Sequence, residues 1–271
     1  MCICGKLYNI NLKLTQFLLI KSVYIASMIK YFRLTLPVLA LFASSCSSVY
    51  MPNVPNTPML SKQGEFSGGG HISLKGNISI NGAYAASNHL GLLFSGSAMS
   101  NERRGKDFNH KLIEIGGGYF DTFGPDNNQI IEIYGGLGKG WSDITFRDFK
   151  GDVLISSDVQ EVDYRKSFLQ VNYSSKKKNN LKLFGENFPI NYGTALRISH
   201  VNMDRFFING VVQPKEDNIF LEPIFFTRMT LSKIIQLQYT TSSNFGLKSR
   251  KYMSAGNSIF TAGIVFNVGG K

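Results

Sequence analysis

The chain has 271 residues, a formal net charge of +11, three cysteines and 27 glycines. This length allows one large domain or two smaller ones, and the ordinary apolar share of 43% excludes a disordered chain. The basic residues are spread along the chain, whereas nucleic-acid binding needs a clustered basic face, so no nucleic-acid partner is expected. No apolar run approaches the ~18 residues of a transmembrane helix.

The segment that begins at Met28 has the order of an export signal. A short positive region, an apolar stretch and three small residues follow one another before Cys46. The apolar stretch is too short to span a bilayer, so we expect cleavage rather than anchoring. Residues 1–45 are therefore predicted to be a signal-peptide region whose true start is Met28.

A cysteine at the cleavage point resembles the bacterial lipoprotein signal, in which the thiol is acylated and becomes the new N-terminus. Cys46 is the predicted lipidation site, and ordinary secretion is the alternative. Cleavage would leave Cys46 as the only cysteine, so no disulfide, cysteine-based metal site or thiol catalysis is expected. Residues 46–64 contain several prolines and show no hydropathy period, which indicates an extended, lipidated tether.

The remaining residues, 65–271, alternate in hydropathy and are punctuated by Asn, Asp, Gly and Lys clusters, which is typical of strands and turns. The pattern predicts an all-β, antiparallel up-and-down barrel of about ten strands, within a range of eight to twelve. The predicted strands lie near residues 65–73, 76–86, 89–99, 110–121, 128–141, 164–174, 191–203, 218–229, 232–242 and 257–268.

The two faces of each strand differ in polarity. In the fifth strand Ile131 and Ile133 share one face, while Glu132 and Tyr134 share the other. This alternation suits a transmembrane barrel, whose strands need ~9–11 residues, although alternation alone also fits a soluble barrel or sandwich.

Connection lengths favour the outer-membrane alternative, because such barrels have long external loops and short periplasmic turns. With a lipidated Cys46 in the periplasm, strand one would run outward. The expected external connections lie near residues 74–75, 100–109, 142–163, 204–217 and 243–256, and the expected periplasmic ones near 87–88, 122–127, 175–190 and 230–231. Four of these external connections are long, and the periplasmic exception, 175–190, is interpreted as an insertion or a further short strand.

Three stretches carry a resemblance to a known group of proteins. They are CSSVYMPNVPNTPMLSKQGE after the signal, ISINGAYAASNHLGLLFSG in the early strands and LEPIFFTRMTLSKIIQLQY in a late strand pair. Together they resemble the small outer-membrane β-barrel lipoproteins of Bacteroidetes bacteria, most of which lack an assigned activity. The resemblance implies an outer-membrane location with a lipid anchor, and it carries over no catalytic residue.

Motifs of enzymatic chemistry are not found. The four histidines show no paired metal-binding spacing, and neither the GxSxG elbow nor a phosphate-binding loop occurs. We therefore expect a protein that is not an enzyme and that needs no cofactor and no metal.

Five charged residues fall inside predicted strands instead of turns. Isolated burial of charge costs several kcal/mol, so such residues need partners. They are interpreted as a polar network in the lumen, either a structural ladder that closes it or a polar passage or small-ligand site. The five residues are Glu114, Glu132, Arg197, Glu222 and Arg228.

Basic residues in two expected external connections are candidate contacts for lipopolysaccharide phosphates. They are Arg103, Arg104, Lys106, Lys248, Arg250 and Lys251. Three functions remain open at this point. The first is a non-enzymatic outer-membrane lipoprotein barrel with a structural, adhesive or envelope-interaction role. The second is a small transport pore or lipid-handling barrel, and the third is a soluble, lipid-tethered periplasmic barrel that binds a ligand.

Overall fold

The computed structural model of the chain describes residues 48–183, 185–254 and 259–269, without the side chains of 177–179. The predicted signal region and the predicted lipidation site Cys46 lie outside the described residues. Within the described part, no helix has the length and apolarity to cross a membrane.

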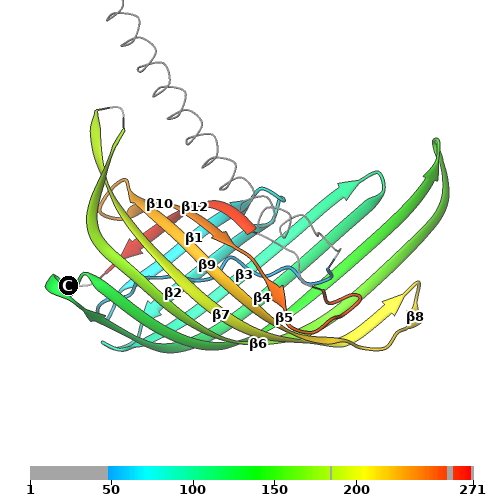
Figure 1. Cartoon of the computed structure of the whole chain (residues 1–271), viewed down its shortest axis with the longest axis horizontal. Helices are drawn as coiled ribbons and strands as arrows, with labels where there is room; N and C mark the ends of the chain where they lie inside the picture. Colours follow the sequence, from blue (N-terminus) through cyan, green and yellow to red (C-terminus); the bar gives the residue numbers. More distant parts are fainter. Residues whose placement is uncertain (1–47, 184, 255–258, 270–271) are drawn as a thin grey trace, which may run out of the picture. The chain divides into compact units, whose positions relative to one another are not determined.

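In the described part of the chain, ten long strands and two very short ones form a single antiparallel sheet (Figure 1). The long strands are β1 Phe66–Ser73, β2 Ile78–Ala85, β3 Leu90–Arg103, β4 Lys106–Phe123, β5 Gln129–Lys150, β6 Val153–Leu183, β7 Glu186–Ile208, β9 Asp217–Thr230, β10 Ile235–Ser242 and β12 Ile259–Val268. The short strands are β8 Val211–Val212 and β11 Phe245–Gly246, and a 3-10 turn, η1, covers Pro125–Asn127.

The sheet closes on itself. Each long strand pairs with its neighbours in chain order, β7 pairs with β9, and the first strand pairs with the last from Phe66↔Val268 to Ser73↔Thr261. The prediction of an antiparallel up-and-down barrel of ten strands is therefore confirmed.

The barrel has two distinct ends. The end with the β1–β2, β3–β4, β5–β6, β7–β9 and β10–β12 connections is called the loop end here. The opposite end, called the turn end, carries the other connections together with the start of β1 and the end of β12.

Three of the predicted long connections are wrong, because most of their residues belong to strands. Residues 100–109 and 142–163 are hairpins whose strands continue to two-residue turns at 104–105 and 151–152. At the turn end, 175–190 is the hairpin of β6 and β7 and not an insertion. The tip of the β5–β6 hairpin has water on both sides, since every residue of 150–159 is exposed regardless of parity. The alternation that marks a strand in sequence is therefore missing there.

The outer face carries an apolar belt around the barrel. Ile72, Ile115 and Leu137 are 63%, 62% and 64% exposed, and contiguous exposure of this kind marks contact with lipid or a partner. Tyrosines gather on the outer face toward the turn end, as in the aromatic girdle of membrane barrels. They are Tyr84, Tyr119, Tyr173 and Tyr192. The fold is thus of the outer-membrane type.

Strand glycines allow large side chains to lie flat inside the wall. A Cβ on Gly140 would lie 2.2 Å from the ring of Tyr164, and one on Gly263 would lie 2.2 Å from Nδ1 of His71. Both rings occupy lumen space that any larger residue at the glycine would deny them.

Candidate functional site

The lumen is occupied by the chain's own N-terminal residues. Residues 48–60, called the lumen segment, are all buried and belong to no strand. In Figure 1 this blue stretch runs lengthwise through the barrel, from the loop end to the turn end where β1 begins. Eight strands already enclose a lumen filled by side chains, so ten leave room for one extended chain. The stretch interpreted as a tether is therefore a packed part of the barrel.

At the loop end the lumen segment is held by Tyr50. Its hydroxyl donates a hydrogen bond of 2.8 Å to Oε1 of Glu222, and its ring lies 4.6 Å from that of Phe220 between centroids. The backbone N–H of Val49 donates to the carbonyl of Tyr252, in the β10–β12 connection, at 3.1 Å. The start of the segment is thus fixed to both the wall and a loop.

In the middle of the lumen segment, the barrel wall forms hydrogen bonds with the backbone and the side-chain amides of the segment. Gln170 donates through Nε2 to the carbonyl of Asn56 at 2.8 Å, and Asn56 Nδ2 donates to the carbonyl of Gly82 at 2.8 Å. The hydroxyl of Ser97 donates to Oδ1 of Asn53. These bonds satisfy polar groups of a segment that has no sheet partner.

At the turn end two of the predicted network residues bind the segment. Arg228 donates to the carbonyl of Pro58 at 3.2 Å and to the carbonyl of Thr57. Glu132 accepts the backbone N–H of Leu60 through Oε1 at 3.1 Å. A buried cation and a buried carboxylate thus take backbone groups of the segment as partners.

Three of the predicted residues meet around a lysine that sequence reasoning missed. Lys166 Nζ lies 2.8 Å from Glu114 and 3.7 Å from Glu222, and Arg197 Nη1 lies 3.3 Å from Glu114. Arg197 also donates from Nε to Gln170 at 2.6 Å. All five predicted residues are buried: Glu114, Glu132, Arg197, Glu222 and Arg228. Lys166 lies on the same face of β6 as buried Tyr164 and Gln170. This alternation is the sequence signal that could have placed Lys166 in the lumen.

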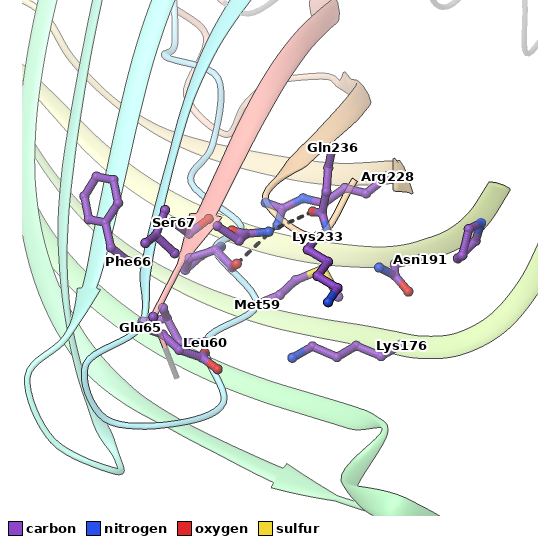
Figure 2. Close-up of a pocket in the computed structure, with 15 residues that line it drawn as sticks. Met59, Leu60, Glu65, Phe66, Ser67, Lys176, Asn191, Arg228, Lys233 and Gln236 are labelled. Atoms are coloured by element: carbon purple, nitrogen blue, oxygen red, sulfur yellow. Dashed lines mark hydrogen bonds between the residues drawn. The ribbon is translucent and has the colours of Figure 1, made fainter. Parts of the chain in front are cut away.

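A cavity of about 340 Å³ opens at the turn end, beside the last residues of the lumen segment. Its lining comes from the segment, β1, β6, β7, β9, β10 and β12. Figure 2 shows Arg228, Lys176 and Lys233 around this space, with Met59 between them.

The histidines serve packing and hydrogen bonding. Buried His110 lies 2.6 Å from the hydroxyl of Tyr164 through Nε2, and buried His71 lies 3.2 Å from Asn81 Nδ2. Among the described residues, no group of three or more His, Cys, Asp or Glu side chains could hold a metal ion.

Three of the candidate basic residues at the loop end pair with acids of the protein. Arg104 pairs with Asp152 at 2.6 Å, while Arg250 pairs with Asp217 at 2.8 Å and Lys248 pairs with the same carboxylate. Hydrogen bonds from Lys248 and Arg250 hold the pKa of Asp217 well below its ordinary value. Arg104 thus joins the β3–β4 turn to the β5–β6 turn, and Lys248 and Arg250 hold the β10–β12 connection on β9.

Comparison with known proteins gives similarity of structure alone. No protein-family model matches the chain, and no curated protein matches it. The translocator domain of autotransporter NalP from Neisseria meningitidis is 10% identical, with 75% of this chain and 85% of that chain covered and a TM-score of 0.45. A bacterial polysaccharide outer-membrane secretin is 6% identical, with 78% and 100% covered and a TM-score of 0.26.

Proposed function

We propose that this protein is an outer-membrane lipoprotein whose barrel holds its own N-terminal segment across the membrane. Its role is structural, adhesive or in envelope interaction, and it is not enzymatic. The observation that carries the proposal is the burial of residues 48–60 along the lumen, from one end to the other. A pore would need that space empty.

The contacts of the segment support a permanent occupant. Removing it would leave the buried side chains of Arg228, Glu132 and Glu222 without their partners at Thr57, Pro58, Leu60 and Tyr50. Each buried polar group left unpaired costs about 1–3 kcal/mol, and more when it is charged. The lumen is therefore built for the segment.

The orientation follows from the ends of the barrel. The β7–β9 and β10–β12 connections, the longest ones, lie at the loop end, and both ends of the barrel sequence lie at the turn end. Because outer-membrane barrels have short periplasmic turns and longer external loops, the turn end is assigned to the periplasm. The start of the lumen segment, at Ser48, then lies at the end of the barrel that faces the cell exterior.

This orientation moves the predicted lipid anchor to the outer face. Cys46 precedes Ser48 by two residues, which span at most ~7 Å of chain. The sequence analysis predicts Cys46 in the periplasm. In the proposed orientation, the lipid anchor and the two ends of the barrel lie instead on opposite faces of the membrane. The anchor itself rests on the export signal and on the resemblance to Bacteroidetes lipoproteins. Lipopolysaccharide is the candidate partner at that surface.

Three epitope insertions test the arrangement. One is placed between Ser47 and Ser48, one between Gly151 and Asp152 at the loop end, and one between Ser232 and Lys233 at the turn end. We expect intact cells to bind antibody at the first two, and the third to be reached after the outer membrane is opened. If the first epitope instead behaves like the third, the segment does not cross the barrel. If all three are reversed, the orientation is wrong.

A cross-link tests the occupied lumen directly. Cysteines replacing Asn53 and Ser97, whose side chains touch, should form a disulfide on oxidation or react with a short bifunctional reagent. The matched pair replaces Asn53 and Phe94, which faces outward, and should not react. Absence of the first cross-link would contradict the proposal.

Lipidation and conductance separate the remaining alternatives. Cys46→Ser should abolish incorporation of labelled fatty acid, and unchanged labelling would remove the lipoprotein assignment. The intact protein should not conduct in planar bilayers, whereas deletion of residues 48–60 should open a conducting lumen if the unheated protein still migrates as a folded barrel. Steady conductance by the intact protein would favour the transport pore.

A further inference from the structure

The cavity at the turn end is lined by an excess of positive charge. The three cations that line it are Lys176 on β6, Arg228 on β9 and Lys233 in the turn between β9 and β10. The one acid that lines it is Glu65. Figure 2 shows the amino groups of Lys176 and Lys233 turned toward the same space beside Met59. The proposed role of the barrel does not use this feature.

Glu65 attracts Lys176 electrostatically, but it forms no ion pair with any of the three cations among the described residues. The two carboxylate oxygens of Glu65 accept hydrogen bonds from the backbone N–H and the hydroxyl of Ser61, at 2.6 and 2.8 Å. Among the residues that the structure describes, no carboxylate lies within ion-pair distance of Lys176, Arg228 or Lys233. The cavity therefore has two more positive than negative charges on its walls.

Arg228 is the deeply buried one of the three cations. It is 2% exposed, and its guanidinium donates to Gln238, to the carbonyl of Pro58 and to that of Thr57, all of them neutral acceptors. A guanidinium has five N–H donors, so these three bonds do not exhaust it. The buried carboxylate of Glu132 attracts Arg228 without forming an ion pair with it, and an anion in the cavity would add a closer counter-charge.

We infer that this cavity binds the phosphate group of a small molecule. Three converging cations suit a dianion, and lysine and arginine are the usual phosphate partners. The amide of Asn191 adds a neutral polar group, while Met59 and Leu60 add apolar lining. The volume lies in the range of small-molecule sites, ~300–1,000 Å³.

Two sources share this chemistry. One is a soluble phosphate monoester of the periplasm. The other is a phospholipid headgroup, because Phe66 and Val268, which line the cavity, are 46% and 53% exposed on the outer face. In both cases the bound group is the phosphate.

The test uses the full chain in a non-ionic detergent at low salt. Calorimetric titration with glycerol 3-phosphate is compared with mixed micelles that contain phosphatidic acid. The variant is Lys176→Gln with Lys233→Gln, since glutamine can still donate to Ser61 as Lys176 does at 3.1 Å. Arg228 is left intact because it holds the lumen segment. The matched control is Lys62→Gln, an exposed lysine at the same end that does not line the cavity.

We expect the double variant to bind at least about tenfold more weakly, which corresponds to about 1.4 kcal/mol, and Lys62→Gln to stay within twofold of the parent. Binding of glycerol 3-phosphate identifies a soluble ligand, and binding of phosphatidic acid alone identifies a headgroup. Lys233→Gln by itself, at an exposed site, repeats the test if the double variant does not fold. Failure of the parent to bind either probe, or equal loss in Lys62→Gln, overturns the inference and leaves the epitope and cross-link results unaffected.

Discussion

Tyr50 and Glu222 are joined by a hydrogen bond of 2.8 Å although 172 positions separate them in sequence. Tyr50 belongs to the lumen segment and Glu222 to β9, so this bond ties the first described residues to the wall of the barrel. Glu222 also lies 3.7 Å from Lys166, the lysine that pairs with Glu114. The lumen segment and the charged network are therefore one connected system.

Tyr50→Phe should destabilise the folded barrel by about 1.5–3 kcal/mol, the usual range for a hydrogen bond to a charged group. The variant keeps the ring contacts with Phe220 and removes the donor to Glu222. The measurement is the urea midpoint of unfolding in detergent. Tyr239→Phe, on the exposed outer face, is the control and should change stability by less than ~0.5 kcal/mol. Equal effects would mean that the buried hydroxyl contributes nothing specific.

Glu114→Gln should cost about 3–5 kcal/mol, because it leaves Lys166 and Arg197 buried with one carboxylate fewer. Glu161→Gln, an exposed position on the β5–β6 hairpin, serves as the matched control with little change. Both are measured by denaturant unfolding. A Glu114→Gln barrel as stable as the parent would show that the pair is dispensable.

The outer face is tested by placing arginine on it. Ile133→Arg should cost about 2–4 kcal/mol near the bilayer midplane, since Ile133 lies in the apolar belt. Leu154→Arg should cost little, because Leu154 is equally outward and half exposed but lies on the hairpin beyond the belt. Refolding equilibria in lipid vesicles provide both values. If the two variants lose the same stability, the belt does not contact lipid.

Acid should loosen the β10–β12 connection. Asp217, the first residue of β9, faces Lys248, Arg250 and His200, and the bonds from Lys248 and Arg250 lower its pKa from the ordinary value of 3.8. A lowered folded-state pKa stabilises at pH values above 3.8, and this contribution is lost as pH falls from there toward the folded-state value. Amide exchange of residues 247–253, corrected for intrinsic rates, should therefore accelerate below pH ~4.

Asp217→Asn is the control for the acid effect. It should raise exchange in residues 247–253 already at neutral pH and remove the part of the acid response that Asp217 causes. Glu216, which accepts the backbone N–H groups of Lys251, Tyr252 and Met253, is intact in this variant. An unchanged acid response would assign the effect to other groups.

The barrel wall is predictable from sequence where one face meets apolar surroundings and the other does not. Ile131 and Ile133 are exposed to the outside while Glu132 and Tyr134 are buried, as their alternation predicts. The same rule fails at the β5–β6 hairpin, since both faces there meet water and no alternation is selected.

The lumen segment follows no rule of local pattern. Asn53, Asn56 and Thr57 are polar residues between prolines, and they are buried because distant strands surround them. Their partners, such as Gln170 and Arg228, lie more than 100 positions away. Without those contacts the stretch has the composition of a linker, and so the sequence predicts one.

The pairing of β1 with β12 has a consequence for the order of assembly. The first strand follows the lumen segment directly, and its partner is the last strand of the chain. Once these two strands are paired, the closed ring admits no chain from the side, and lengthwise entry would have to draw the acylated Cys46 of the proposed lipoprotein through the lumen. Residues 48–60 must therefore be seated before the seam forms. Residues 48–60 can leave the lumen sideways only after β1 and β12 separate. The rate of that separation therefore limits their release, whatever their affinity for the lumen.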